Sequence, residues 1–96
     1  MTFKKALIPI QMIPESPRKV EFRQGYVSGE YGFHRDEKEW KAIDLLSGCY
    51  ICSMPSRKAC VEWIEQNKEL LNSVKQERSY HEKVLNFYKL LKIELN

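Results

Sequence analysis

Neither glycine nor proline occurs between Ser56 and Asn96, so the residues that most often break helices are missing from this part of the chain. Long apolar runs are also missing, and no stretch approaches the ~20 apolar residues that a membrane-spanning helix needs. Near the start, Pro9 interrupts a short apolar run and no small-residue cleavage site follows, so we expect no signal peptide. Without a secretory signal, three cysteines, an odd number, indicate a reducing cytoplasm.

An excess of charge of one sign is absent as well. The chain has 16 Lys and Arg residues against 13 Asp and Glu residues, with a net charge of +3, and it carries no basic tail. This balance argues against a mimic of DNA, because imitating a phosphate backbone requires a strongly negative surface. It neither requires nor excludes binding to nucleic acid.

Motifs for catalysis and phosphate binding are likewise missing. Gly25, Gly29 and Gly32 do not lead from a strand into a helix, as the glycines of a phosphate-binding loop would. His34 and His81 stand alone, and no serine or cysteine lies in a recognisable nucleophile motif. Catalysis needs several groups with complementary roles, and the sequence nominates none. We therefore predict a protein that is not an enzyme and needs no cofactor.

The cysteines include a C-x-x-C pattern formed by Cys49 and Cys52, with Cys60 further along. One interpretation is a zinc or redox site, which needs converging ligands or a thiol at the start of a helix. In a strand, however, residues three apart point to opposite faces, and the expected helix begins later, at Ser56. We favour buried, metal-free thiols that act as small apolar residues.

The residues that are present are typical of one globular domain over residues 1–96, since 43% are hydrophobic and 30% are charged. Residues 1–55 are expected to be mostly strands and turns, and residues 56–96 helical. The predicted fold class is α+β, with a small antiparallel sheet of three or four strands followed by two helices packed on one face. Trp40 and Trp63 are placed to anchor the helical part on the sheet.

Strand-like sequence recurs through the first half. Residues 40–45 and 49–53 flank a Leu-Ser-Gly turn and predict a hairpin, and residues 18–23 alternate as a half-buried strand does. The apolar segment before them contains Pro9, which cannot donate to a ladder, so that strand belongs on an edge or is broken. A turn is expected at residues 15–17.

The glycines between residues 25 and 32 lie among aromatic residues, and glycine in strand-like sequence indicates a bulge or a close backbone approach. Residues 35–39 predict a solvated loop before the hairpin.

The helical half begins at Ser56, whose hydroxyl can accept from a first-turn backbone N–H. An apolar stripe then recurs at helical spacing through Cys60, Trp63, Ile64, Leu70, Leu71 and Val74, and again through Val84, Leu85, Tyr88, Leu91 and Leu95. The stripe is interrupted for about a turn between these halves, and Ser79 with Glu82 has the spacing of a capping box. We favour a helical hairpin broken near residues 75–79. The alternative is one helix of ~40 residues, about 60 Å long, which would need a partner chain to cover its far end.

Two surfaces are candidates for binding. On the sheet, basic residues lie among aromatic ones, and such a surface can bind nucleic acid by phosphate neutralisation and base stacking. The residues that we nominate for this role are Arg23, Arg35, Lys41, Arg57 and Lys58. An ordinary half-polar sheet with tyrosines at its rim explains the same pattern.

The second surface is the C-terminal helix. Around Tyr80, Phe87 and Tyr88, apolar residues flank the main stripe on both sides, which is more apolar surface than one contact face requires. Excess apolar surface on a terminal helix indicates a protein partner.

A resemblance runs through residues 40–64, about a quarter of the chain. The residues that carry it are Trp40-x-Ala-Ile-Asp-x-x-Ser47-Gly48-x-x-Ile51, then Ser56-Arg57-Lys58-Ala59 and Trp63-Ile64. This pattern resembles a strand-turn-strand-helix module of small phage and mobile-element accessory proteins, and it is similar also to the AP2-like arm-binding domains of phage integrases. The resemblance implies a cytoplasmic, non-catalytic protein that inhibits or modulates a host protein or nucleoprotein complex, as anti-CRISPR proteins do. The alternative that it implies is a DNA- or RNA-binding module that uses the sheet.

Overall fold

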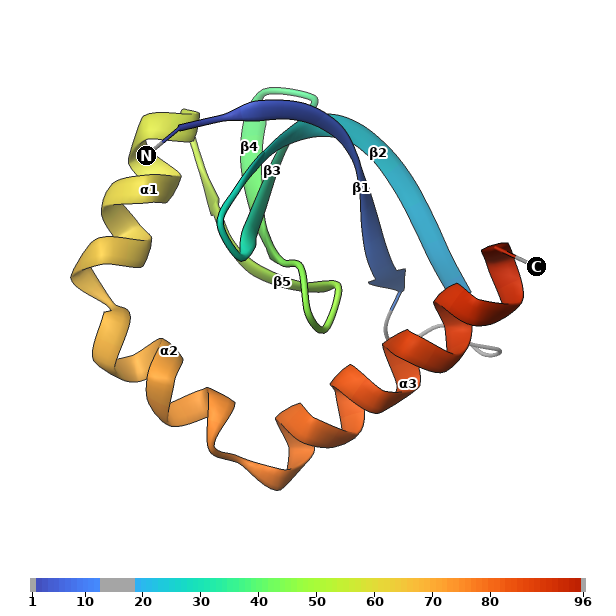
Figure 1. Cartoon of the computed structure of the whole chain (residues 1–96). Helices are drawn as coiled ribbons and strands as arrows, with labels where there is room; N and C mark the ends of the chain where they lie inside the picture. Colours follow the sequence, from blue (N-terminus) through green and yellow to red (C-terminus); the bar gives the residue numbers. More distant parts are fainter. Residues whose placement is uncertain (1, 13–18, 96) are drawn as a thin grey trace.

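The computed structural model describes residues 2–12 and 19–95, without the side chains of residues 94 and 95, and shows five strands followed by three helices in that part of the chain (Figure 1). The strands are β1 (Lys4–Met12), β2 (Lys19–Ser28), β3 (Tyr31–Asp36), β4 (Glu39–Asp44) and β5 (Cys49–Met54). The helices are α1 (Arg57–Gln66), α2 (Lys68–Lys75) and α3 (Arg78–Leu95). The predicted α+β class is confirmed, although there are more strands and one more helix than predicted. The turn predicted at residues 15–17 lies outside the described residues.

The sheet is an antiparallel meander in the order β1-β2-β3-β4-β5. β1 is an edge strand and contains Pro9, as predicted. An edge strand pairs with a neighbour on one side only, so it tolerates a residue that has no backbone N–H. β3 was not predicted, because Gly32 and the charged residues at its end interrupt the apolar–polar alternation that marks a strand. Residues 35–39, predicted as a loop, contain only a tight turn with Glu37 at a φ of 56° between paired strand residues.

The sheet curls strongly along β1 and β2 (Figure 1). The Gln11 backbone N–H donates to the Gly48 carbonyl at 2.7 Å, so the end of β1 returns to the turn between β4 and β5. Glycine makes the curl possible, because a Cβ at Gly25 would collide with the Phe33 carbonyl and with the Ile8 side chain. The predicted close backbone approach is thereby confirmed.

The main core lies between the sheet and α1. Its buried members are Phe33, Ala42, Cys52, Cys60 and Ile64. Trp40 and Trp63 pack against this cluster and are partly buried, so both serve as the predicted anchors. The predicted cap is also confirmed, since the Ser56 hydroxyl accepts from the Ala59 backbone N–H at 3.0 Å.

Three helices follow one another in an arc, where two helices were predicted (Figure 1). The break predicted near residues 75–79 is confirmed, so the single long helix is excluded. A second break occurs at Asn67, whose side-chain amide donates to the Trp63 carbonyl at 2.8 Å and closes α1. The predicted capping box does not form, because Ser79 lies inside α3 and Glu82 pairs with Arg78 at 3.3 Å.

The buried face of α3 differs from the predicted stripe. Phe87 is 2% exposed and lies against Gly48, where a Cβ would collide with its ring. Leu85 and Tyr88, predicted on the core face, are 54% and 63% exposed. Helical spacing predicts an apolar stripe, but it does not predict which side of the helix meets the sheet. None of the helices in the described ranges is long and apolar enough to cross a membrane.

Candidate binding grooves

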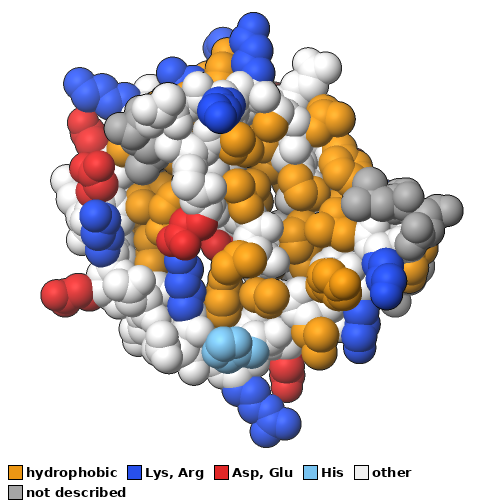
Figure 2. Space-filling view, viewed as in Figure 1, with side chains coloured by type: hydrophobic (Ala, Val, Ile, Leu, Met, Phe, Trp, Pro, Cys, Tyr) orange, Lys and Arg blue, Asp and Glu red, His pale blue; other side chains and the backbone are white. Residues whose placement is uncertain are grey.

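A groove with mainly apolar walls lies between β5 and the arc of helices, and we call it the Asp44 groove. It encloses about 300 Å³. Its apolar walls come from Tyr50, Ile51, Trp63, Leu70, Leu71 and Val74. Figure 2 shows hydrophobic side chains gathered over the space between the sheet and the helices. Leu70 is 54% exposed and Tyr50 57% exposed, so the walls offer apolar surface to a bound molecule.

Asp44, the last residue of β4, supplies the polar part of this groove and is 5% exposed. Its Oδ2 accepts from the Ser47 backbone N–H at 3.2 Å, from the Ser47 hydroxyl at 2.7 Å and from the Tyr80 hydroxyl at 2.8 Å. The turn after β4 places Ser47 beside the Asp44 side chain. The Gly48 backbone N–H closes this turn by donating to the Asp44 carbonyl. Tyr80 comes from α3, and burial, together with its bond to Asp44, raises the pKa of Tyr80 well above its ordinary value. Tyr80 is therefore a fixed donor to this carboxyl group.

Two buried oxygens beside Ser47 have no hydrogen-bond donor among the described residues: Asp44 Oδ1 and Gln11 Oε1. The Gln11 amide is oriented by its own donations to the Ser47 carbonyl at 2.8 Å and to the Lys83 carbonyl at 3.2 Å. A buried acceptor that lacks a donor costs about 1–3 kcal/mol. The described part of the chain also provides no ion pair for Asp44. The groove thus combines apolar walls with a carboxyl group whose Oδ2 accepts three hydrogen bonds and whose Oδ1 is fully buried.

The rim of the Asp44 groove carries Lys75, which is already paired with Glu30 and lies 5.6 Å from the centre of the Tyr31 ring. The Lys75 ammonium donates to Glu30 and holds the pKa of that carboxyl below its ordinary value, although partial burial opposes the shift. This contact ties α2 to the turn between β2 and β3. The Lys75 ammonium therefore pairs with Glu30 and not with Asp44.

The three thiols have different surroundings. Cys49 lies at the Asp44 groove and its Sγ is 3.6 Å from the Ser47 carbonyl, whereas Cys52 is in the main core beside Cys60. All three are free. Burial raises the pKa of Cys52 to about 12 and also raises that of Cys60, which keeps both as thiols and makes them poor nucleophiles.

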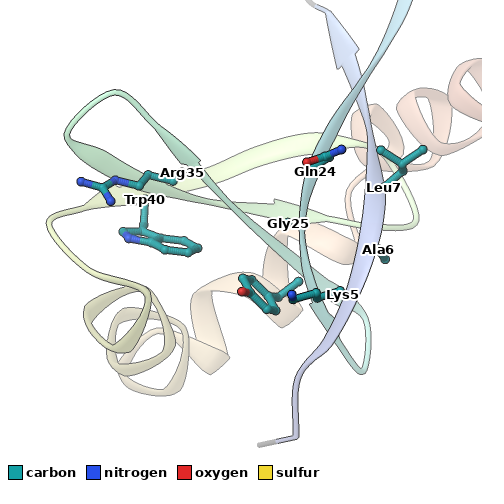
Figure 3. A pocket seen from close by; sticks show the side chains of 8 residues that line it. Lys5, Ala6, Leu7, Gln24, Gly25, Arg35 and Trp40 are labelled. Carbon is teal, nitrogen blue, oxygen red and sulfur yellow. The ribbon is translucent and has the colours of Figure 1, made fainter.

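A second groove crosses β1 to β4 beyond the edge of α1, and we call it the basic groove (Figure 3). It is shallow and encloses about 690 Å³. Its polar and aromatic lining residues are Lys5, Gln24, Tyr26, Arg35 and Trp40. Strand register assembles it, because Lys5 pairs with Tyr26 across β1 and β2, and Arg35 pairs with Trp40 across β3 and β4.

Arg57, on the first turn of α1, supports the aromatic wall of the basic groove. Its guanidinium carbon lies 4.2 Å from the ring centre of Phe3, 4.6 Å from that of Tyr26 and 5.8 Å from that of Trp40. Such cation–π contacts hold planar groups against one another. The centres of the Tyr26 and Trp40 rings are 6.3 Å apart. Arg57 contacts both rings and so helps to fix their relative positions.

The five residues nominated for nucleic acid do not form one surface. Arg35 lines the basic groove and Arg57 lies over the Tyr26 ring, whereas Lys58 is exposed on α1. Arg23 and Lys41 line a different depression and are paired with carboxylates, Arg23 with Glu21 at 3.4 Å and Lys41 with Asp36 at 2.8 Å.

The three residues nominated for a protein partner are also separated. Tyr80 is bonded to Asp44 and lines the Asp44 groove, and Tyr88 is exposed on α3. Phe87 is part of the core, which leaves no surface of its side chain for a partner to contact.

Sequence reasoning missed Asp44, Gln11 and Lys5. The Asp44-x-x-Ser47 spacing before a glycine is a local signal, because an aspartate side chain often bonds to the backbone of a following turn. No local signal marks the bond from Tyr80 or the place of Lys5, since these depend on how distant segments meet.

Comparisons of this chain with protein-family models, with curated proteins and with solved structures found no match. The two grooves are therefore interpreted from their own chemistry.

Proposed function

We propose that the chain is a non-catalytic binding protein that inhibits or modulates a host protein or nucleoprotein complex by holding a segment of a partner protein in the Asp44 groove. The observation that carries this proposal is a set of exposed apolar walls around a buried carboxyl group that lacks a donor for one oxygen. Interfaces draw most of their energy from a few buried anchors, often aromatic side chains or arginine, that fill pockets of this kind. The resemblance of residues 40–64 to phage accessory modules makes a host complex in the cytoplasm the proposed target.

The chemistry of the groove defines the partner segment. Leu70, Val74 and Ile51 would contact apolar side chains, and a partner amide, ammonium or guanidinium group would lie at the acidic end of the groove, which Asp44 and Glu77 line.

Site-specific photo-cross-linking tests the proposal. A cross-linking side chain at position 70 should form a defined adduct in a bacterial lysate, to be identified by mass spectrometry. The same group at position 88, which is exposed on α3 but does not line the groove, should not form that adduct. An adduct from position 88 and none from position 70 would move the binding surface to the outer face of α3.

With the purified partner, Leu70→Glu should weaken binding at least about tenfold, which is 1.4 kcal/mol. Ile93→Glu is the matched control, because Ile93 is 74% exposed and lies outside the groove. Equal losses for the two variants would contradict the proposal.

A further inference from the structure

The lining of the basic groove has two cations and no carboxylate, whereas the Asp44 groove includes Asp44 and Glu77 and the depression at Arg23 includes Glu21 and Asp36. The two cations of the basic groove are Lys5 and Arg35. Arg35 donates to the backbone carbonyl of Glu37 at 3.2 Å and not to a carboxylate. Neither cation has an ion-pair partner among the described residues. Both cations are therefore available to pair with an anionic ligand.

Aromatic surface lies between these two cations. In Figure 3 the Trp40 indole lies between Arg35 and Lys5. Trp40 and Tyr26 both line the groove, and Arg57 contacts both rings from α1. The rings are thus positioned before a ligand arrives, which lowers the entropy that binding must overcome.

We propose that the basic groove binds a single-stranded nucleic acid segment, with phosphates at Lys5 and Arg35 and a base against the Trp40 and Tyr26 rings. Cations on either side of aromatic rings match the alternation of phosphates and bases along a strand. A duplex fits less well, because its base faces are stacked inside the helix and cannot reach the rings. The site goes beyond the proposed function, since it shares no lining residue with the Asp44 groove.

Trp40 fluorescence provides a direct measurement. Trp63→Phe removes the other tryptophan, so emission then comes from the basic groove alone. Titration with a single strand of about ten nucleotides, in DNA and RNA form, should quench this emission. Two neutralised phosphates predict a log–log salt dependence of about −1.4, at about −0.7 per phosphate for single strands. The matching duplex should bind more weakly at every salt concentration.

A pair of double variants separates the groove from overall charge. Lys5→Ala with Arg35→Ala should weaken binding at least about tenfold and abolish most of the salt dependence. Arg23→Ala with Lys41→Ala removes the same charge from ion-paired positions, and affinity should stay within about twofold. Leu70→Glu, which disturbs only the Asp44 groove, should leave oligonucleotide affinity unchanged. A thermal melt of each variant checks that it is folded.

Equal losses in the two double variants would show attraction to net charge only and would overturn the proposed site. The absence of quenching at low salt, or tighter binding of the duplex, would overturn it as well.

Discussion

The two grooves are assembled in different ways. The basic groove takes its lining from four neighbouring strands, whose hydrogen-bond register brings Lys5, Tyr26, Arg35 and Trp40 together. The Asp44 groove needs the sheet and all three helices, and its bond from Tyr80 to Asp44 spans 36 positions. The first groove should therefore persist wherever the sheet is intact, whereas the second depends on closure of α3. Strand pairing and helix docking thus control separate surfaces of one small chain.

The strongest test of this difference is Phe87→Ala, which removes the buried side chain that packs α3 on Gly48. The free energy of unfolding should fall by about 3–5 kcal/mol, as for other buried large aromatics. Urea denaturation measures it. Tyr88→Ala, at the next position but 63% exposed, should change the value by no more than about 0.5 kcal/mol. Similar effects at both positions would mean that α3 is not docked through Phe87.

A smaller effect is expected from Tyr80→Phe, which keeps the ring and removes the donor to Asp44 Oδ2. The free energy of unfolding should fall by about 1–3 kcal/mol, because a buried acceptor loses a hydrogen bond. Tyr50→Phe is the control in the same groove, since Tyr50 is 57% exposed and its hydroxyl reaches solvent. Oligonucleotide binding at the basic groove should be unchanged in both variants. A loss of that binding in Tyr80→Phe would show that the two grooves are coupled and would contradict their independence.

The smallest effect concerns the contact that ties α2 to the sheet. Glu30→Gln should lower the free energy of unfolding by about 0.2–1 kcal/mol at neutral pH, because the pair with Lys75 is partly exposed. Lys75 lowers the pKa of Glu30, so this stability is fully present above the ordinary value of 4.5 and is lost as pH falls through the lowered pKa. The difference in the free energy of unfolding between the wild-type protein and Glu30→Gln should therefore disappear in acid. Glu65→Gln, an exposed substitution on α1, should show no such pH dependence.

Much of the fold was predictable because its signals are local. The hairpin over residues 40–53, the cap at Ser56 and the break after Lys75 each follow from a few adjacent residues. β3 was missed because its alternation is interrupted by Gly32 and ends in charged residues. Of the candidate site, Arg35, Arg57 and Tyr80 were nominated from the sequence, whereas the contacts that they make were not predicted.

The sequence by itself determined the hairpin of β4 and β5, the start of α1 after Ser56 and the break before α3, because turns, caps and breaks of this kind depend on neighbouring residues. It also determined that α3 carries apolar residues on more than one side. Only the tertiary structure decided that the side with Phe87 is buried and the side with Tyr88 is exposed. Helical periodicity specifies the spacing of the faces, but the face that meets the sheet depends on the curl of β1 and β2 and on the turn at Gly48. The same path of the chain brings Tyr80 to Asp44 and leaves the basic groove uncovered.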